Sequence, residues 1–407
     1  MSEQPRIEFY RHHLGEEEKA AVLAALDEPI LTTGAATAAA ERALAEYLNL
    51  PEVVCLDSCT AALHLALLAL GIKPGDEVIV PAMTFTATAN AVLMAGARPV
   101  FADVDPVTAL LTPQTVARHV TAQTRAIIPV HLYGQLCDMI GLRALADRHG
   151  LKLIEDSAHC LEARHAGVRP GSHGDCACFS FYATKNITCG EGGALAARDP
   201  DLAARVRRLA LHGMTTSAYE RFGHRYRHWD MPQWGWKYNL DNIRAALLVP
   251  QVRRLDERWR RRQLLAERYE AGLTNVPGVT FPRVIARDAS ARHLFTIWVP
   301  PGRRDDVLAG LQDRGVGVAV NYRAVHLLEY YRRALGYTRG TLPVAESIGD
   351  RTVTLPLYPG LSEAQVDRVI AAVAATVSCG GDTPARSGVE RRGRVTAPLA
   401  AGSPARG

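Results

Sequence analysis

Short apolar runs alternate with longer amphipathic stretches through residues 50–200, and this alternation limits the possible folds more than any other feature. The runs are VVCL (53–56), EVIVP (77–81), PVFAD (99–103), AIIPV (126–130), LKLIED (151–156), CACFSF (176–181) and GALAA (193–197). Helix-like segments lie between several of them, at 59–70, 86–96, 139–149 and 200–211. Strands and helices in alternation form a largely parallel sheet covered by helices. We therefore predict an α/β fold with a mostly parallel central sheet.

The pattern changes after about residue 240. A long charged helix is expected over 241–274, with Pro250 marking a kink or break. Beyond it, VTFPRV, HLFTIWV and VGVAVN are typical of strands, and 303–313 and 362–376 of helices. Since 407 residues exceed the roughly 100–200 of one domain, we expect several units. These are a large domain over 1–240, a linking helix over 241–274, and a smaller C-terminal α+β domain over 275–378.

Composition excludes several classes of protein. The net charge is +5, but residues 379–407 hold five Arg against Asp382 and Glu390, so this tail carries +3 and the rest only +2. That is too little to argue for nucleic acid. The tail is rich in Gly, Pro and Ser and has no aromatic residue, so we expect a disordered basic tail.

No apolar run approaches the roughly 20 residues that cross a bilayer, and the N-terminus lacks a secretory signal pattern. The sequence therefore predicts a soluble cytoplasmic protein with no membrane partner. The eight cysteines include no C-x-x-C pair and no zinc-like spacing, so no metal site is expected.

The stretch FSFYATKNITCGEGG, residues 179–193, is the most informative for chemistry. Lys185 follows a buried strand and precedes a Gly-rich turn, which places it at the edge of the sheet facing a cleft. A lysine there can be a plain surface charge. Its neighbours, however, are mostly small or uncharged, and desolvation lowers the pKa of a lysine and frees its amine to attack a carbonyl. A Schiff base with pyridoxal phosphate is the best-known use of such a group.

Pyridoxal phosphate also needs a carboxylate at its pyridine nitrogen and donors for its phosphate. Asp156 ends the strand LKLIED, at the carboxyl edge where α/β proteins bind ligands, while Glu155 points to the opposite face. Either acid could instead be an ordinary strand-end residue. The segment DSCTAALHLALLAL (57–70) offers a helix N-terminus for the phosphate, although Ser58 or Thr60 could be only an N-cap.

Two further residues could contact the ring of the cofactor. Phe85, between a strand and a helix, could stack on one face, and His159 in EDSAHC could cover the other. A lone aromatic or histidine is more often a core residue, so both roles depend on Lys185 and Asp156. Ser180 could add a phosphate contact.

Several long strings occur together in the order and spacing of one family: SCTAALHLAL, GDEVIVPAMTFTATANAV, AIIPVHLYGQ, LIEDSAH, FSFYATKNITCGEGG and GWKYNLDNIRAAL. The chain resembles the DegT/DnrJ/EryC1/StrS family of sugar aminotransferases from about residue 7 to 376. The resemblance implies a fold type I enzyme that uses pyridoxal 5'-phosphate and acts on nucleotide-linked keto sugars.

Roles follow from the resemblance motif by motif. Lys185 resembles the lysine that holds the cofactor covalently and then moves the proton, and Asp156 resembles the pyridinium partner. The phosphate turn, a second phosphate contact, the stacking aromatic and the residue beside the ring correspond to Thr60 with Ala61, Ser180, Phe85 and His159. The chemistry implies that Lys185 and Asp156 are catalytic.

The family's site is shared across a homodimer, where an Asn commonly reaches the partner's phosphate. This chain has Lys237 at that position and Asn239 two residues later. A lysine can still neutralise phosphate as a point charge. The chain departs from the family's usual residues at two other places. Cys59 stands in the phosphate turn, where its side chain could crowd the phosphate, and Ala40-Glu41 replaces a Phe-Glu pair.

The C-terminal strings most resemble the branch that aminates C4, as in the enzyme making UDP-4-amino-4-deoxy-L-arabinose, with L-glutamate as the expected donor. His326, Arg323, Tyr322 and Arg225 are candidate substrate contacts. Tyr322 could instead be a packing residue, and the loop that holds Arg225 could be a dimer contact.

Three alternatives remain at this point. Members that act on cyclitol ketones share these motifs. Pyridoxal phosphate dehydratases of the family carry His at the position of Lys185. A regulator could bind nucleic acid or a partner through its basic tail.

Overall fold

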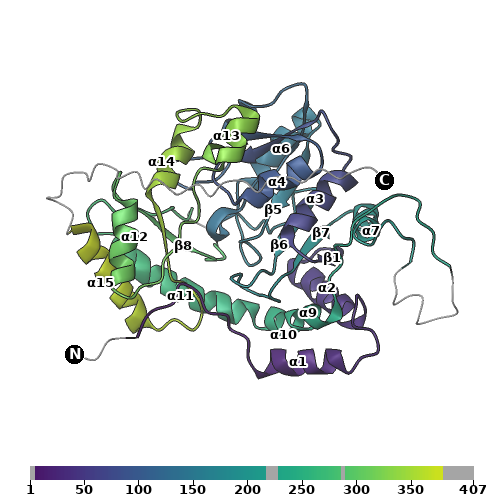
Figure 1. The fold of residues 1–407 in the computed structure, drawn as a ribbon, viewed down its shortest axis with the longest axis horizontal. Helices are drawn as coiled ribbons and strands as arrows, with labels where there is room; N and C mark the ends of the chain where they lie inside the picture. Colours follow the sequence, from purple (N-terminus) through teal and green to yellow (C-terminus); the bar gives the residue numbers. More distant parts are fainter. Residues whose placement is uncertain (1–4, 217–227, 286–288, 379–407) are drawn as a thin grey trace, which may run out of the picture.

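The computed structural model describes residues 5–216, 228–285 and 289–378, so the predicted disordered tail and Arg225 lie outside the described residues. A seven-stranded sheet occupies its centre (Figure 1). The strand order is β1 (Glu52–Leu56), β7 (Gly193–Ala197), β6 (Cys176–Ser180), β5 (Lys152–Asp156), β4 (Thr124–Ile127), β2 (Glu77–Pro81) and β3 (Arg98–Ala102). Among these strands, β7 runs in the opposite direction to the other six. The prediction of a mostly parallel α/β sheet is confirmed.

Alternate residues of each strand bury against opposite layers. In β1, Val54 and Leu56 join the core beneath α3 (Cys59–Ala69), while Val53 and Cys55 join the core beneath α2 (Ala35–Leu48). Since side chains alternate along a strand, a sheet with helices on both faces has apolar residues at every strand position. This accounts for the continuous apolar runs in the sequence.

Among the remaining helices of the large layer, α4 (Thr86–Met94), α6 (Met139–His149) and α7 (Pro200–Leu209) follow the predicted segments closely. Three further elements were not predicted from the sequence: α1 (Glu16–Leu26), the short α5 (Pro113–Ala117) and the single turn η1 (Leu132–Gly134). Ser58, Asp138 and Asp199 cap α3, α6 and α7 through side-chain oxygens, which satisfies backbone donors in the first turns.

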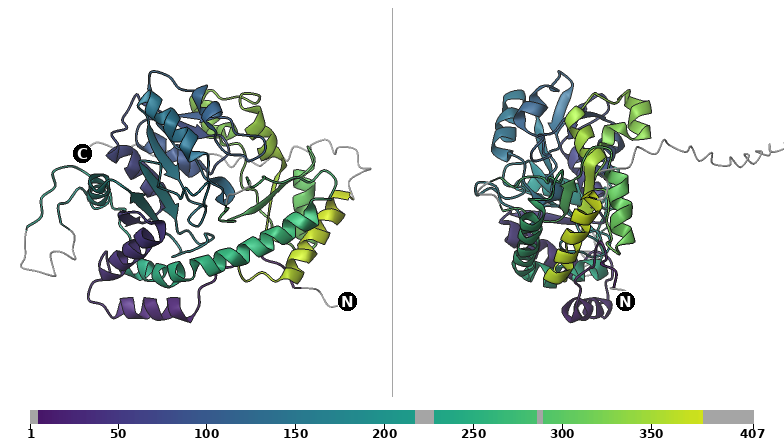
Figure 2. Two further views of the ribbon diagram at one scale, coloured as in Figure 1. Left: turned by 180° about the vertical axis from the view of Figure 1, so that it is seen from behind. Right: turned by 90° about the vertical axis from the view of Figure 1, so that its left-hand side faces the viewer.

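The expected long helix is three consecutive helices: α9 (Asn242–Ala246), α10 (Leu248–Arg253) and α11 (Leu255–Leu273). The interruptions fall at Leu247 and Arg254, not at Pro250, which is buried inside α10. Pro250 is tolerated because it lies in the first turn of α10, where a backbone N–H has no acceptor within the helix. Figure 2 shows α11 running from the large layer to α15 (Glu363–Ser378).

A smaller sheet follows α11. It pairs β8 (Phe295–Trp298) antiparallel with β9 (Thr352–Leu355), and α11, α12 (Arg304–Asp313) and α15 pack around it. The prediction that VTFPRV and VGVAVN form strands is wrong, since they make only single bridges at Thr280, Val316 and Ala319. Thr280 and Ala319 bridge β8 and β9, whereas Val316 bridges Ile7 of the N-terminal segment.

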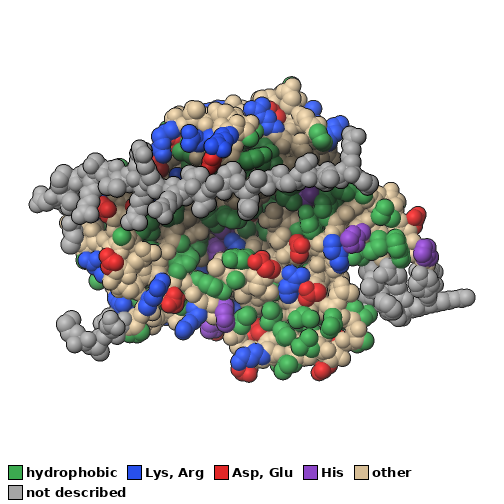
Figure 3. Space-filling view, viewed as in Figure 1, with side chains coloured by type: hydrophobic (Ala, Val, Ile, Leu, Met, Phe, Trp, Pro, Cys, Tyr) green, Lys and Arg blue, Asp and Glu red, His purple; other side chains and the backbone are tan. Residues whose placement is uncertain are grey.

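Residues 324–351 pack mainly against the large layer, and their last helix also contacts β8 of the small sheet. This segment contains the turn η2 (Val325–Leu327) and the helices α13 (Glu329–Leu335) and α14 (Pro343–Arg351). Its buried residues Val325, Tyr331 and Ile348 belong to the same core as β2 and β3. On the face in Figure 3, Lys and Arg side chains gather over α13 and α14, whereas both signs of charge are intermixed below.

Candidate active site

Asp156 lies at the carboxyl end of β5 and is 5% exposed. Its Oδ2 accepts a hydrogen bond of 2.7 Å from Thr88 Oγ1, and its Oδ1 accepts one of 3.2 Å from the Ala158 N–H. Burial raises the pKa of this carboxyl, while the two hydrogen bonds and the charge of Lys185 oppose that rise. The site therefore holds a carboxylate that is costly to ionise but is supplied with donors.

Glu155 faces the other side of β5, as predicted from strand alternation. It is fully buried, pairs with His131 at 2.9 Å, and accepts the N–H groups of Gly171 and Gly174. Because His131 Nδ1 accepts the Cys137 N–H, its Nε2 carries the proton toward Glu155. Glu155 therefore braces the loop before β6, and Asp156 is the acid left for chemistry.

Lys185 follows β6, in the loop that returns to β7. Burial lowers the pKa of its amine to about 8, against the opposing influences of Cys59 and Asp156. A substantial fraction of the amine is consequently neutral near physiological pH, which is the state that attacks a carbonyl.

His159 is held by hydrogen bonds at both ring nitrogens. Its Nδ1 accepts the Tyr133 N–H at 3.3 Å, so Nε2 carries the proton of the neutral ring and donates to the Tyr322 hydroxyl at 3.2 Å. Burial and the neighbouring Lys185 hold the pKa of His159 well below its usual value. Tyr133 provides its N–H from a left-handed backbone (φ +60°), an uncommon conformation for a residue with a side chain.

Lys185, Asp156 and His159 line one cavity of about 520 Å³, within the range of small-molecule sites. Phe85 and Tyr322 face each other at its rim, with ring centroids 5.7 Å apart, and Phe85 is 57% exposed. Ser58, Cys59, Thr60 and Ser180 also line the cavity. The structure thus brings together most of the predicted cofactor residues.

The predicted phosphate turn lies at the start of α3, at one end of this cavity. Ser58 Oγ accepts the Ala61 N–H at 3.1 Å. In this structure the Ala61 N–H therefore serves the N-cap of α3, whereas from the sequence we expected it to donate to the phosphate. A side chain at Gly193 would lie 2.4 Å from the Cys59 nitrogen, so the backbone of β7 supports the turn directly. Cys59 is 8% exposed and its side chain lies against the cavity wall.

Lys237 and Asn239 lie elsewhere. Neither is among the described residues that line the cavity; they contact one another, and Asn239 Nδ2 donates to Thr33 Oγ1 at 2.7 Å. Their role across a dimer stays a prediction.

Of the predicted substrate residues in the described ranges, only Tyr322 lines the cavity. The expectation that His326 contacts substrate is wrong for this structure, because His326 is fully buried and its Nε2 lies 3.1 Å from Glu346 Oε1. It packs between Phe101 and Tyr337 in the core. Arg323 is exposed and is not one of the described lining residues, whereas Tyr322 lines the cavity.

Sequence reasoning missed Thr88 and Phe9. Thr84 lies just before α4 and its Oγ1 is 2.7 Å from Oγ1 of Thr88 in the first turn, so the TFTAT run carried a signal for a polar pair at the start of that helix. Phe9 reaches the cavity from the N-terminal segment, which nothing in its local sequence indicates. Glu41, a departure noted above, accepts two bonds from Arg207 and one from the Cys55 N–H, and so anchors β1.

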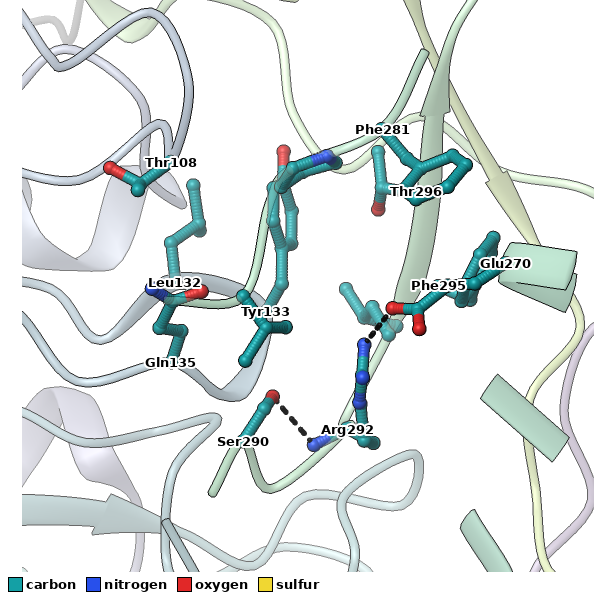
Figure 4. Close-up of a pocket in the computed structure, with 13 residues that line it drawn as sticks. Thr108, Leu132, Tyr133, Gln135, Glu270, Phe281, Ser290, Arg292, Phe295 and Thr296 are labelled. Carbon is teal, nitrogen blue, oxygen red and sulfur yellow. Dashed lines mark hydrogen bonds and ion pairs between the residues drawn. The ribbon is translucent and has the colours of Figure 1, made fainter. Parts of the chain in front are cut away.

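A second cavity lies where the large layer meets the small sheet (Figure 4). Its volume is about 30 Å³, and the Arg292–Glu270 ion pair of 2.7 Å closes one side. It holds no more than a few waters and is too small for a cofactor.

Of the described helices, none has the length and apolar content to span a membrane, and no group of three His, Cys, Asp or Glu side chains in the described ranges could hold a metal ion.

Comparisons with known proteins agree with this chemistry. Residues 12–374 match the profile of the DegT/DnrJ/EryC1/StrS aminotransferase family. The spore coat polysaccharide biosynthesis protein SpsC of Bacillus subtilis is 39% identical over 368 residues, 88% of this chain and 94% of SpsC.

Two solved structures extend the likeness to the fold. The putative sugar aminotransferase Spr1654 of Streptococcus pneumoniae, in its pyridoxamine phosphate (PMP) form, is similar with a TM-score of 0.87 and 30% identity over 92% of this chain and 99% of that one. Its pyridoxal phosphate (PLP) form has also been solved. DesV of S. venezuelae, solved with a ketimine intermediate, is similar with a TM-score of 0.83 and 37% identity over 91% of this chain and 98% of that one.

Proposed function

Because the chain belongs to the DegT/DnrJ/EryC1/StrS aminotransferase family and is a pyridoxal-phosphate-dependent sugar aminotransferase, we propose its substrates and the roles of its residues. L-glutamate donates the amino group, and C4 of a nucleotide-linked keto sugar receives it. Lys185 holds the cofactor. The observation that carries these roles is the single cavity lined by a lysine of lowered pKa, Asp156 and His159.

Bound pyridoxal phosphate supplies an electrophilic carbonyl and an electron sink. Lys185 Nζ is the base that takes the proton from the α-carbon of the donor, and it returns a proton in the acceptor half of the reaction. Its lowered pKa suits both directions of transfer near neutral pH. The Asp156 carboxylate, held by Thr88, retains the proton on the pyridine nitrogen.

The rest of the cavity orients the reactants. His159 is neutral, so it adds no positive charge beside Lys185 and serves as a flat wall for the ring. The start of α3, with Thr60 and Ser180 beside it, is suited to the phosphate because a helix N-terminus favours anions. Tyr322 receives the His159 proton in a hydrogen bond, which leaves its own O–H available to a sugar oxygen.

We infer further that two copies share their sites and that the product enters a cell-envelope polysaccharide. Lys237 and Asn239 lie outside this chain's own cavity, which is consistent with a position facing a partner. SpsC, the similar Bacillus protein, is named for polysaccharide biosynthesis. Cytoplasmic location stays a prediction from the sequence. Light scattering of the purified chain tests the dimer.

The first test is the visible spectrum of the purified chain with pyridoxal phosphate, before and after L-glutamate. A yellow band that bleaches supports the donor; nucleotide-linked 4-keto sugars and cyclitol ketones are then compared as acceptors. A band that persists argues against glutamate, and release of a ketone without a donor favours the dehydratase reaction.

The matched variants are Lys185→Ala and Lys73→Ala, the second at an exposed lysine. Lys185→Ala loses the covalent band and turnover but keeps the fold, whereas Lys73→Ala behaves as the parent chain. Turnover in purified Lys185→Ala would refute the assignment.

A further inference from the structure

Three polar side chains form a chain of hydrogen bonds behind Lys185, and the reaction described above does not use them. Glu162 is 5% exposed, and its Oε1 accepts a bond of 2.8 Å from Asn186 Nδ2. Asn186 follows Lys185 directly in the sequence. Asn186 Oδ1 lies 3.0 Å from Nδ1 of His293, which is 3% exposed.

The directions of these bonds are fixed by what each group can donate. Asn186 Nδ2 also donates to the Ala291 carbonyl at 3.0 Å, so the amide nitrogen faces two groups that accept. Its Oδ1 can only accept, and His293 Nδ1 must therefore carry the proton. The neutral ring then has an unprotonated Nε2. An amide cannot pass a proton along, so the chain sets a tautomer and does not relay protons.

His293 is part of the wall that faces the cofactor residues. Its ring centroid lies 4.4 Å from that of His159, at 40°, and its backbone N–H donates to the Tyr133 carbonyl at 3.1 Å. Glu162, Asn186 and His293 line a small cavity together with Lys185 and His159. Its volume is about 10 Å³, close to that of one water. Glu162 Oε2, buried with no partner among the described residues, borders it.

The charged groups around these hydrogen bonds explain why the protonation state of His293 matters for Lys185. Burial raises the pKa of Glu162 to about 7, against the hydrogen bond from Asn186 and the charge of Arg262. Burial, His159, Lys185 and Arg262 all lower the pKa of His293, and Arg262 donates to the His293 carbonyl. A proton added to His293 would put a second positive charge beside Lys185, in a site with little solvent to screen it.

We propose that Glu162, Asn186 and His293 are a positioning network that holds His293 as the neutral, Nδ1-protonated tautomer. The network thereby fixes the orientation and the charge of the two-histidine wall beside Lys185. This inference rests on the proposed role of Lys185 in the reaction.

The test separates the network from the reaction by observing His293 in cofactor-free protein. ¹⁵N-histidine NMR of the full chain reports which ring nitrogen carries the proton, with His293→Gln to assign the signal. Wild type gives a protonated Nδ1 and a bare Nε2. In Glu162→Ala, Asn186 Nδ2 keeps only the Ala291 carbonyl as an acceptor, which holds the amide less firmly, so a mixture of His293 tautomers is expected. Glu162→Gln keeps an oxygen for Asn186 Nδ2 and restores the wild-type signal.

The holoenzyme provides the second readout. Glu162→Ala lowers kcat of the glutamate half-reaction by about 10- to 100-fold with little change in KM, because misplaced groups slow a reaction without weakening binding. Glu346→Gln, at a buried Glu–His pair outside the cavity, is the matched control and leaves kcat unchanged. A wild-type His293 signal and wild-type kcat in Glu162→Ala overturn the proposal.

If Glu162→Ala does not fold, Asn186→Leu decides the question. Leucine is of similar size and removes the oxygen that accepts from His293 Nδ1, so a mixture of His293 tautomers is expected. A wild-type His293 signal in Asn186→Leu also overturns the proposal. A wild-type chain with the expected tautomer but no transaminase activity would refute the proposed function and leave the network intact.

Discussion

Thr88 is expected to control the ionisation of Asp156, and Thr88→Val tests this with almost no change in shape. Its hydroxyl gives the strongest of the influences that lower the pKa of Asp156 against burial, through a bond of 2.7 Å. A buried hydrogen bond to a charged group is worth about 1.5–3 kcal/mol. Because 1.4 kcal/mol corresponds to tenfold, kcat/KM for L-glutamate should fall by about 10- to 100-fold.

The pH dependence of Thr88→Val shows in which direction the pKa of Asp156 has moved. Without the hydroxyl, the pKa of Asp156 rises further, so the carboxylate forms only at higher pH. The acid limb of the kcat/KM profile therefore moves to higher pH, and the loss is largest in acid. Thr88→Ser keeps the hydroxyl and is the control. Thr84→Val removes the outer hydroxyl but leaves the Thr88–Asp156 bond, so its effect should be smaller. An unmoved acid limb in Thr88→Val, with normal thermal stability, would refute the reasoning.

Three further predictions concern the turn, the amine and the core. Gly193→Ala should displace the Ser58–Cys59 turn, because its Cβ would lie 2.4 Å from Cys59 N. A spectral titration should then show weaker binding of pyridoxal phosphate. Gly360→Ala is the control, since its Cβ meets nothing closer than 3.9 Å. Cofactor-free chain should take up pyridoxal phosphate faster as pH rises through about 8, because the Lys185 amine loses its proton there; a rate that falls with pH would contradict the lowered pKa. Since this pKa lies below that of the unfolded chain, unfolding by urea should also become harder as pH rises above about 8. Glu346→Ala should lower the free energy of unfolding by about 1–3 kcal/mol, because it removes the acceptor of the neutral His326 ring and of the Gly340 and Leu342 N–H groups. KM for the sugar should be unchanged, and a raised KM would return His326 to the substrate site.

Sequence reasoning correctly placed the site residues that lie at the ends of strands, because the geometry of a strand determines which way they face. Asp156 and Glu155 were separable because neighbouring strand residues face opposite ways, and the structure gives the two acids separate partners. The same rule predicted the sheet, because runs buried on both faces are apolar throughout.

The rest depended on contacts between segments far apart in the chain. His326 lies in a motif beside Tyr322, yet one turn further along it enters the core with Glu346. Thr88 and Asp156 are 68 residues apart, and only the packing of α4 on the sheet joins them. Pro250 was misplaced as a break because its effect depends on its distance from the helix start, which composition does not give.

The left-handed turn at Tyr133 has a consequence for evolution within such a scaffold. Tyr133 accepts the His293 N–H through its carbonyl and supplies its own N–H to His159, so segments 160 residues apart share one turn. Gly134 packs so closely on residues 291–292 that a side chain there would meet the Arg292 nitrogen at 2.8 Å. A C-terminal half exchanged between relatives is therefore expected to keep this packing only if residues 131–134 are exchanged with it.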